Sequence, residues 1–293
     1  MKLDEMGEDA VVARLIKLLR VNERVQLRAG DDCAVVRNAG NLQLLKTDCI
    51  IEGIHFLREA DAKDVGWKAL CRSISDIAAM GGKPLDALVT VALPGQLEFD
   101  WLRGLYLGLR KAARAYGVNL VGGETAKSPG PIFVSVSLTG AIVDGKYVTR
   151  AGGKAGDWIY VTGQLGGSIK GKHLRFHPRV EQANWLVEHY PIHAMMDVSD
   201  GLASDLPRMA TSSKLGFEID TAKIPRSPSS QVENALYDGE DYELLFAAPD
   251  KTKSSLEKEW KTAFPSLRLT AIGRLVRRGL RNFESKGYQH FHK

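Results

Sequence analysis

Residues 66–95 read GWKALCRSISDIAAMGGKPLDALVTVALPG, and this stretch joins a helix pattern directly to a strand pattern. Apolar residues from Trp67 to Ala78 recur at three- and four-residue spacing, which predicts a helix over 66–80 with one apolar face. The pair Gly81-Gly82 ends that helix. The run DALVTVAL (86–93) then predicts a buried strand that ends at Pro94-Gly95. A helix followed at once by a buried strand favours layered packing of helices on sheets.

The flanking sequence adds elements of both kinds. We expect helices over 8–20 and 99–116, and strands over 42–45, 50–51, 118–121 and 131–142. Four glycines and several charges interrupt the pattern at 144–157, and a new strand pattern (DWIYVTG) begins at Asp157. The sequence therefore predicts an α/β (α+β) fold in two domains, residues 1–145 and 146–293.

Composition and charge exclude several classes of protein. The chain has 293 residues and a formal net charge of +5, a surplus that suits anionic substrates but does not indicate nucleic acid. No run approaches the roughly 18 apolar residues of a membrane span, and no secretory leader pattern is present. The cysteines Cys33, Cys49 and Cys71 form no CxxC motif and would leave one thiol unpaired. We therefore expect a cytoplasmic protein without a disulfide framework.

Acidic residues lie in six notable places, five of them beside glycines or predicted strands and the sixth on the predicted helix 66–80. These are Gly30-Asp31-Asp32, Thr47-Asp48, Ser75-Asp76, Gly122-Gly123-Glu124, Asp197-Val198-Ser199-Asp200-Gly201 and Gly239-Glu240-Asp241. Mg²⁺ prefers oxygen ligands and takes one or two carboxylates per ion, while glycine lets backbone N–H groups approach a phosphate. The pattern is typical of a site for Mg²⁺ and a phosphate ester. Each place also has a simpler interpretation: a turn, a helix cap or, for Asp76, a solvent-facing helix position.

Other catalytic motifs are missing from the sequence. There is no GxSxG turn for a nucleophilic serine, and the seven histidines form no HExxH zinc motif. The stretch Gly166 to Lys172 has the spacing of a phosphate-binding P-loop. His173 stands where that motif needs a Ser or Thr hydroxyl for Mg²⁺, so we do not expect a P-loop here.

Nine stretches that span nearly the whole chain match a known family in order. They are GDDCAV (30–35), TDCIIEGIHF (47–56), WKALCRSISDIAAMGGKP (67–84), GGET (122–125), TRAGGKAGDWIYVTG (149–163), HLRFHPR (173–179), DVSDGLASDL (197–206), GEDYELLF (239–246) and KGYQHF (286–291). Together they resemble the thiamine-monophosphate kinases. The resemblance implies the two-domain fold of aminoimidazole-ribonucleotide synthetase, with the N-terminal sheet pairing across a homodimer. It also implies ATP-dependent phosphorylation of thiamine monophosphate to thiamine diphosphate with several Mg²⁺ ions.

The resemblance also implies roles for individual residues. The implied metal-site residues are Asp32, Thr47, Asp48, Asp76, Glu124, Asp197 and Asp200, with Asp48, Asp76 and Asp200 most directly involved in catalysis. The implied ATP contacts are Gly123, Glu124, Arg150 and Ser199. The implied contacts to thiamine monophosphate are His55, Glu240 and Tyr288.

Three residues depart from the family pattern. Glu124 stands in place of Asp, Lys46 in place of Ser or Thr, and Ser73 in place of Asn. An ammonium group cannot ligate a metal, so Lys46 either replaces an ion or holds a phosphate.

These departures keep alternatives open. One is a nucleotide- and Mg²⁺-binding regulator without turnover, and another is a metal-dependent phosphatase. A third is another ATP-using enzyme of the superfamily. Against that third reading, the first cysteine, Cys33, is not close to the N-terminus and the chain ends in Lys293 without a terminal cysteine.

Overall fold

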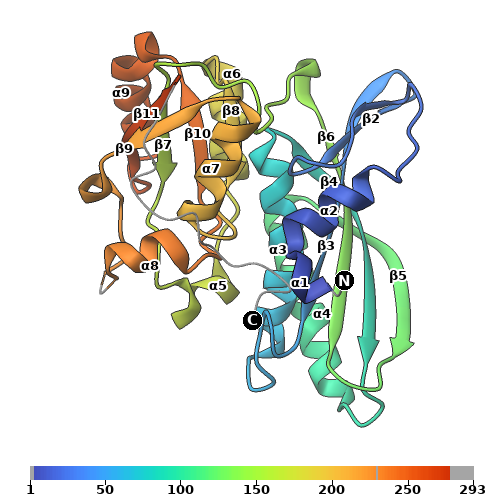
Figure 1. Cartoon of the computed structure of the whole chain (residues 1–293). Helices are drawn as coiled ribbons and strands as arrows, with labels where there is room; N and C mark the ends of the chain where they lie inside the picture. The colour runs from blue at the N-terminus through green and yellow to red at the C-terminus, as the bar shows by residue number, and fades with distance from the viewer. Residues whose placement is uncertain (1–2, 229, 278–293) are drawn as a thin grey trace.

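The computed structural model describes residues 3–228 and 230–277, and its elements form two sheets with associated helices (Figure 1). The first half contains α1 (Leu3–Met6), α2 (Glu8–Ile16), β1 (Val25–Leu27), β2 (Ala34–Asn38), β3 (Asn41–Ile51), α3 (Ala62–Ala79), β4 (Lys83–Leu93), α4 (Phe99–Tyr116), β5 (Asn119–Lys127), β6 (Phe133–Ala141) and the 3₁₀ turn η1 (Val143–Gly145).

The second half continues with further strands, helices and 3₁₀ turns. These are β7 (Trp158–Thr162), η2 (Ser168–Lys170), α5 (Lys172–Arg175), α6 (Val180–His189), β8 (Ala194–Asp197), α7 (Leu202–Ser212), β9 (Gly216–Ile219), η3 (Thr221–Lys223), α8 (Val232–Tyr237), β10 (Leu244–Ala248), η4 (Asp250–Thr252), α9 (Lys253–Ala263) and β11 (Leu269–Val276). None of the helices within residues 3–277 is long and apolar enough to cross a membrane.

The first sheet has the strand order β1-β2-β3-β6-β4-β5 among the described residues. Its pairs are antiparallel except β4 with β5, which α4 connects as a parallel crossover. The helices α3 and α4 cover one face, where Leu44 and Val89 are buried. On the other face Leu45 and Leu88 are 40% and 50% exposed. The first sheet therefore has one open face with apolar side chains.

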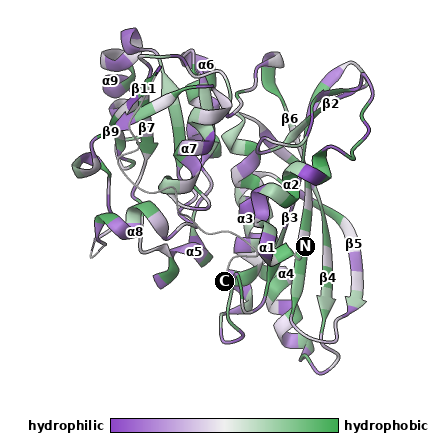
Figure 2. Cartoon of the chain, viewed as in Figure 1, coloured by the Kyte–Doolittle hydropathy of each residue, from purple (hydrophilic) through white to green (hydrophobic). Residues whose placement is uncertain are grey.

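The second sheet has the order β8-β10-β7-β11-β9, and all its pairs are antiparallel. Alternate residues of its central strand, β7, point to opposite sides of the sheet. Ile159 packs with Leu206 of α7, while Tyr160 packs with Trp260 of α9. Apolar residues accordingly follow the strands of this sheet through the interior (Figure 2). This half is a three-layer unit with helices on both faces.

Helix α3 is the element that connects the two halves. It begins at Ala62 because Asp61 caps it, accepting a hydrogen bond from the Lys63 backbone N–H at 2.8 Å. It packs closely on α4, since a Cβ atom at Gly66 would lie 2.0 Å from the carbonyl oxygen of Leu105. It also contacts β3 and β6 of the first sheet and α5, α6 and β8 of the second half. Most of its residues are therefore buried, whichever way they face.

The structure confirms most predicted elements and changes some boundaries. The helix 99–116 is found as predicted, while the helix expected over 8–20 ends at Ile16. The two short strands expected around Thr47-Asp48 are one strand, β3, which pairs with β6 without a break from Gln43 to Ile51. The strand expected over 118–121 continues to Lys127 because β5 stays paired with β4. The α/β fold class is confirmed, whereas the division at residues 145 and 146 stays a prediction.

Candidate functional site

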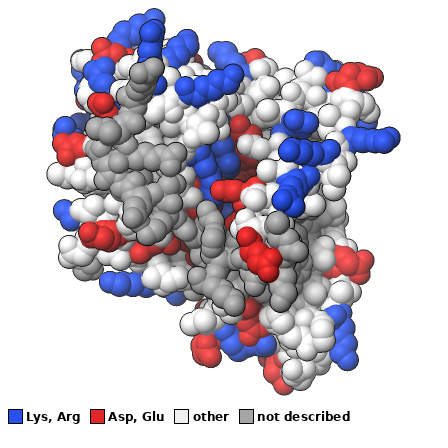
Figure 3. All heavy atoms as spheres, viewed as in Figure 1, with Lys and Arg blue, Asp and Glu red and all other residues white. Residues whose placement is uncertain are grey.

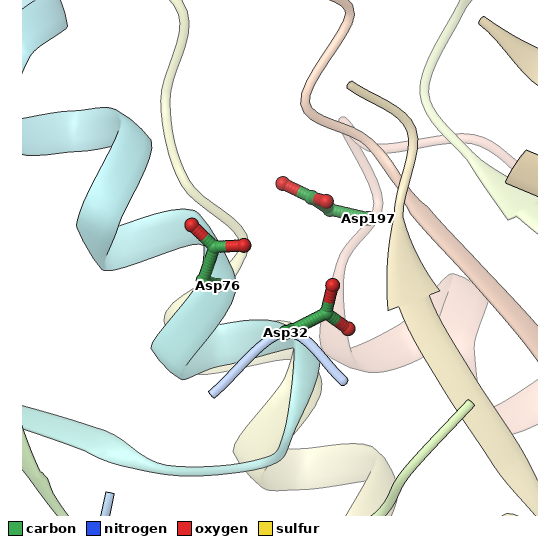
Figure 4. A group of neighbouring side chains, drawn as sticks. All are labelled: Asp32, Asp76 and Asp197. Carbon is green, nitrogen blue, oxygen red and sulfur yellow. The ribbon is translucent and has the colours of Figure 1, made fainter. Parts of the chain in front are cut away.

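Three buried carboxylates from distant parts of the chain meet where the two halves join. Asp32 precedes β2, Asp76 lies in the last turns of α3, and Asp197 ends β8 (Figure 4). One oxygen atom from each lies within 4.8 Å of the others. We call these three residues the acidic trio. It unites three of the six acidic places seen in the sequence, and Asp76 is buried in it instead of facing solvent.

Each carboxylate of the acidic trio has a donor from the protein. Arg150 donates to Asp32 Oδ1 from Nε at 3.2 Å and from Nη2 at 2.5 Å. Ser75 Oγ donates to Asp197 Oδ2 at 2.5 Å. Lys46 Nζ lies 3.0 Å from Asp76 Oδ2. Asp32 Oδ2, however, is buried and has no hydrogen-bond partner within the described residues.

The electrostatics of the acidic trio favour a bound cation. Burial raises the pKa of Asp197 to about 7, and repulsion from Asp32 adds to the effect. Burial also raises the pKa of Asp76, against the attraction of Lys46. Carboxylates that resist ionisation near neutral pH gain most from a divalent cation, and the unpartnered Asp32 Oδ2 offers it an oxygen ligand. The residues present therefore fit Mg²⁺.

A second group of acids lies at the start of α7. The Asp205 carboxylate accepts hydrogen bonds from the backbone N–H groups of Ser199 and Asp200, both at 3.0 Å. Arg208 forms ion pairs with Asp200 and, at 3.0 Å, with Asp205. Asp205 thus fixes the loop that carries two predicted site residues. The sequence reasoning missed its role, although it lies within the DVSDGLASDL stretch.

A cavity between the halves brings together predicted substrate and metal residues. It has a volume of about 130 Å³, and its lining residues are Ile54, His55, Arg72, Ile169, Ser199, Asp200, Asp238, Glu240 and Tyr242. Acidic and basic side chains meet in the hollow between the halves (Figure 3). Asp48 lies next to this cavity, since its carboxylate pairs with Arg72 at 3.4 Å. Tyr288, the third predicted substrate contact, lies outside the described residues.

Lys68 connects the two predicted substrate contacts in this cavity. Its side chain is fully buried, and Nζ donates to both carboxylate oxygens of Glu240 at 2.7 Å and to the carbonyl oxygen of His55 at 2.6 Å. Burial lowers the pKa of Lys68 to about 8, while Glu240 opposes that change. The sequence reasoning missed Lys68, although a lysine within the apolar run Trp67 to Leu70 was a signal.

Thr47 and Glu124 do not join these groups within one copy of the chain. Thr47 is exposed on the open face of β3, where its hydroxyl lies 3.2 Å from that of Ser137. Glu124 is exposed on β5, next to Gly123. The order β3-β6-β4-β5 places these strands three spacings apart, about 14 Å. The two side chains therefore cannot hold the same ion in one copy.

A wider groove runs beside α4 and β5, at the edge of the first sheet that carries Glu124. Its volume is about 1020 Å³, and its lining includes Tyr106, Arg110 and Thr125. None of the acidic trio lines it. The sequence reasoning did not identify this groove, because no single motif marks the outer face of α4.

Comparisons with known proteins agree over most of the chain. Residues 30–142 match the AIR synthase related protein N-terminal domain, and residues 154–263 match the corresponding C-terminal domain. The thiamine-monophosphate kinase of Rhodopirellula baltica is 35% identical, over 92% of this chain and 90% of that protein. The thiamine-monophosphate kinase of Escherichia coli K12 is 33% identical, over 86% and 85%.

Solved structures give the same result. The structure of AaThiL complexed with AMPPCP and TMP is 32% identical, with a TM-score of 0.86 over 99% of both chains. The E. coli hydrogenase maturation protein HypE has a TM-score of 0.69 at 18% identity, covering 92% of both chains, which shows a shared fold alone.

Proposed function

The chain belongs to the thiamine-monophosphate kinase family, and we propose on this basis that it transfers a phosphoryl group from ATP to thiamine monophosphate. The products are thiamine diphosphate and ADP. The observation that carries the proposal is the junction of the two halves, where the acidic trio lies near a cavity lined by His55 and Glu240. Several Mg²⁺ ions and a cytoplasmic location, where ATP is available, are part of the proposal.

The chemistry requires positioning more than proton transfer. The acceptor is a phosphate oxygen that is already anionic near neutral pH, so no strong general base is needed. Asp32, Asp76 and Asp197 would hold Mg²⁺, which when bound neutralises the charge of the crowded phosphates. Arg150 adds a guanidinium that suits a bidentate phosphate contact. The site must otherwise hold the two substrates in alignment for the transfer.

The cavity supplies the acceptor side of the proposed site. Glu240 complements the positive charge of the thiazolium ring, and Lys68 fixes the position of its carboxylate. His55 is held by the Ile51 backbone N–H, which donates to Nδ1 at 3.0 Å. Ser199 and Asp200 line the same cavity, and the Asp205 carboxylate holds them in place by accepting hydrogen bonds from their backbone N–H groups. This arrangement supports recognition of a cationic ring with a phosphate ester.

We also propose that a second copy of the chain covers the open face of the first sheet. That face exposes Leu45 and Leu88. Glu124 lies about 14 Å from β3 in its own copy, so its predicted role at a shared metal requires either a second ion or the partner. Leu88→Glu should yield a monomer in sedimentation analysis, while Leu57→Glu, at a 67% exposed loop position, should not. A dimeric Leu88→Glu variant would contradict this part of the proposal.

The decisive experiment identifies the product. The purified chain is incubated with ATP and Mg²⁺, with thiamine monophosphate, thiamine or no acceptor, and the thiamine esters and ADP are separated chromatographically. Thiamine diphosphate should form only from the monophosphate, with an equal amount of ADP. Asp76→Asn should abolish it, whereas Glu188→Gln, an exposed acid on α6, should not. ADP with free phosphate would instead indicate a hydrolase, and ATP binding without turnover would indicate a regulator.

A further inference from the structure

Lys46 places a positive charge inside the acidic site. It lies on β3 between the buried Leu44 and Asp48, on the face of the strand that α3 covers. Its ammonium group lies 3.0 Å from Asp76 Oδ2, and the two side chains are only 21% and 12% exposed. Lysine side chains normally carry their charge out to water. Here the side chain instead ends beside a carboxylate of the acidic trio.

The ammonium group remains charged at this position. The ordinary pKa of a lysine is about 10.4, so the group is protonated at neutral pH, and the 3.0 Å ion pair with Asp76 Oδ2 favours that charged form. Lys46 therefore provides a permanent unit of positive charge. It occupies a carboxylate oxygen that could otherwise ligate a metal, and an ammonium has no lone pair with which to ligate one itself.

Lys46 alters both the local charge balance and the set of carboxylate oxygens that are open to a metal ion. When all three carboxylates are ionised, as ligands of a metal ion would be, the acidic trio contributes three negative charges, and its direct partners Arg150 and Lys46 contribute two positive ones, which leaves one negative charge. Without Lys46 the remainder would be two negative charges, and Asp76 Oδ2 would lose its ammonium partner and be open to a metal ion.

We propose that Lys46 is a resident cation that takes the place of one divalent ion beside Asp76. This inference rests on the proposed Mg²⁺-dependent function. The chain accordingly binds one divalent ion fewer than a variant with a neutral oxygen ligand at this position. The ion pair of Lys46 with Asp76 also holds β3 to α3 without metal. The stability of the wild type therefore depends less on Mg²⁺ than the stability of the variant does.

The experiment counts bound ions and does not depend on turnover. Mn²⁺ bound per chain is measured by equilibrium dialysis with saturating AMPPCP for the wild type, Lys46→Thr and Lys46→Met. Lys83→Thr, at an exposed lysine on β4, is the matched control. Lys46→Thr should bind one more Mn²⁺ than the wild type and Lys83→Thr. An equal count in Lys46→Thr and the wild type would overturn the proposal, as would a wild type that binds no Mn²⁺.

A second measurement covers the case in which the variants fold poorly. Denaturation midpoints are compared in EDTA and in Mg²⁺. The gain from Mg²⁺ should be larger for Lys46→Thr than for the wild type, because an added ion stabilises the folded state by mass action. Equal gains would overturn the proposal. Because neither readout is kinase activity, a failure to form thiamine diphosphate would count against the proposed function and leave the ion count intact.

Discussion

Adjacent glycines on β5 offer a matched test of how the sheet edge is built. In the parallel pair of β4 and β5, Gly122 lies opposite Leu88 and Gly123 opposite Val89. A Cβ atom at Gly123 would lie 1.7 Å from the Val89 carbonyl oxygen, while one at Gly122 would meet only Leu88 Cδ2 at 3.6 Å. Both glycines have a φ of 156°, so alanine changes the backbone preference equally at the two positions. Only the steric contact differs.

The size of the effect follows from that contact. To bring the Gly123→Ala Cβ to 3.0 Å from the oxygen, the strands must separate by at least about 1.3 Å. Ladder hydrogen bonds near 2.9 Å do not survive such a shift, and each contributes about 0.5–1.5 kcal/mol. Loss of two or three of them should lower the free energy of unfolding by about 2–4 kcal/mol. The same shift moves Glu124 away from its position.

The assay compares the two alanine variants with each other. Urea denaturation gives the difference in free energy of unfolding, and calorimetric titration with AMPPCP and Mg²⁺ gives nucleotide affinity. Gly122→Ala should lose only the stability that its backbone conformation costs an alanine and should keep its AMPPCP affinity, while Gly123→Ala should lose about 2–4 kcal/mol more and also lose affinity. If the two variants differ by less than about 0.5 kcal/mol and bind AMPPCP equally, the close approach of Val89 to Gly123 does not position this edge.

Three further predictions concern the junction of the two halves. Asp48→Asn should abolish formation of thiamine diphosphate while leaving the circular dichroism spectrum unchanged; near-normal activity with Mg²⁺ would remove Asp48 from the site. Lys68→Met should cost about 3 kcal/mol of stability by leaving Glu240 unpaired, and should weaken thiamine monophosphate binding about tenfold. In a denaturation and binding series, Lys68→Met/Glu240→Gln should recover stability without affinity, and no recovery would argue against the ion pair. Because the pKa of Asp197 is raised from 3.8 to about 7, the folded state binds the extra proton, and metal-free stability should fall as pH rises through that window. Mg²⁺ should then raise the melting temperature more at about pH 8 than at about pH 5.5, and equal shifts would contradict this assignment.

The helices show how far local patterns predict this fold. The predicted helix over 99–116 ends where expected because Gly117 adopts the left-handed conformation, with φ 68°. The apolar spacing also predicts helix α3, but Asp76 lies opposite the apolar stripe, and the pattern alone therefore allows it a solvent-facing position. That interpretation assumes that a helix packs against a hydrophobic core on one face only. Because α3 touches the first sheet, α4 and the second half, a position opposite the stripe is buried too.

Strand β3 shows a second limit of pattern reasoning. The polar residues Lys46, Thr47 and Asp48 suggested a break between two short strands. In the structure Thr47 lies on the open face, while Lys46 and Asp48 face α3 and find ionic partners there. A sequence window cannot show such partners, because Arg72 lies 24 residues from Asp48. The same reason hides the pairing of Lys68 with Glu240, 172 residues apart.

The composition of the acidic trio has a consequence for the two halves of the chain. Asp32 and Asp76 belong to the first half and Asp197 to the second, so their mutual repulsion acts across the junction. Arg150 and Lys46 offset part of it. On the proposed function, a Mg²⁺ ion held by all three carboxylates binds the joined halves more tightly than separated ones. By thermodynamic linkage, ion binding strengthens the junction by the same free energy by which joining the halves strengthens ion binding. On the proposed function, metal binding therefore stabilises the junction of the two halves, and the ion pair of Lys46 with Asp76 reduces the repulsion that the metal would have to offset.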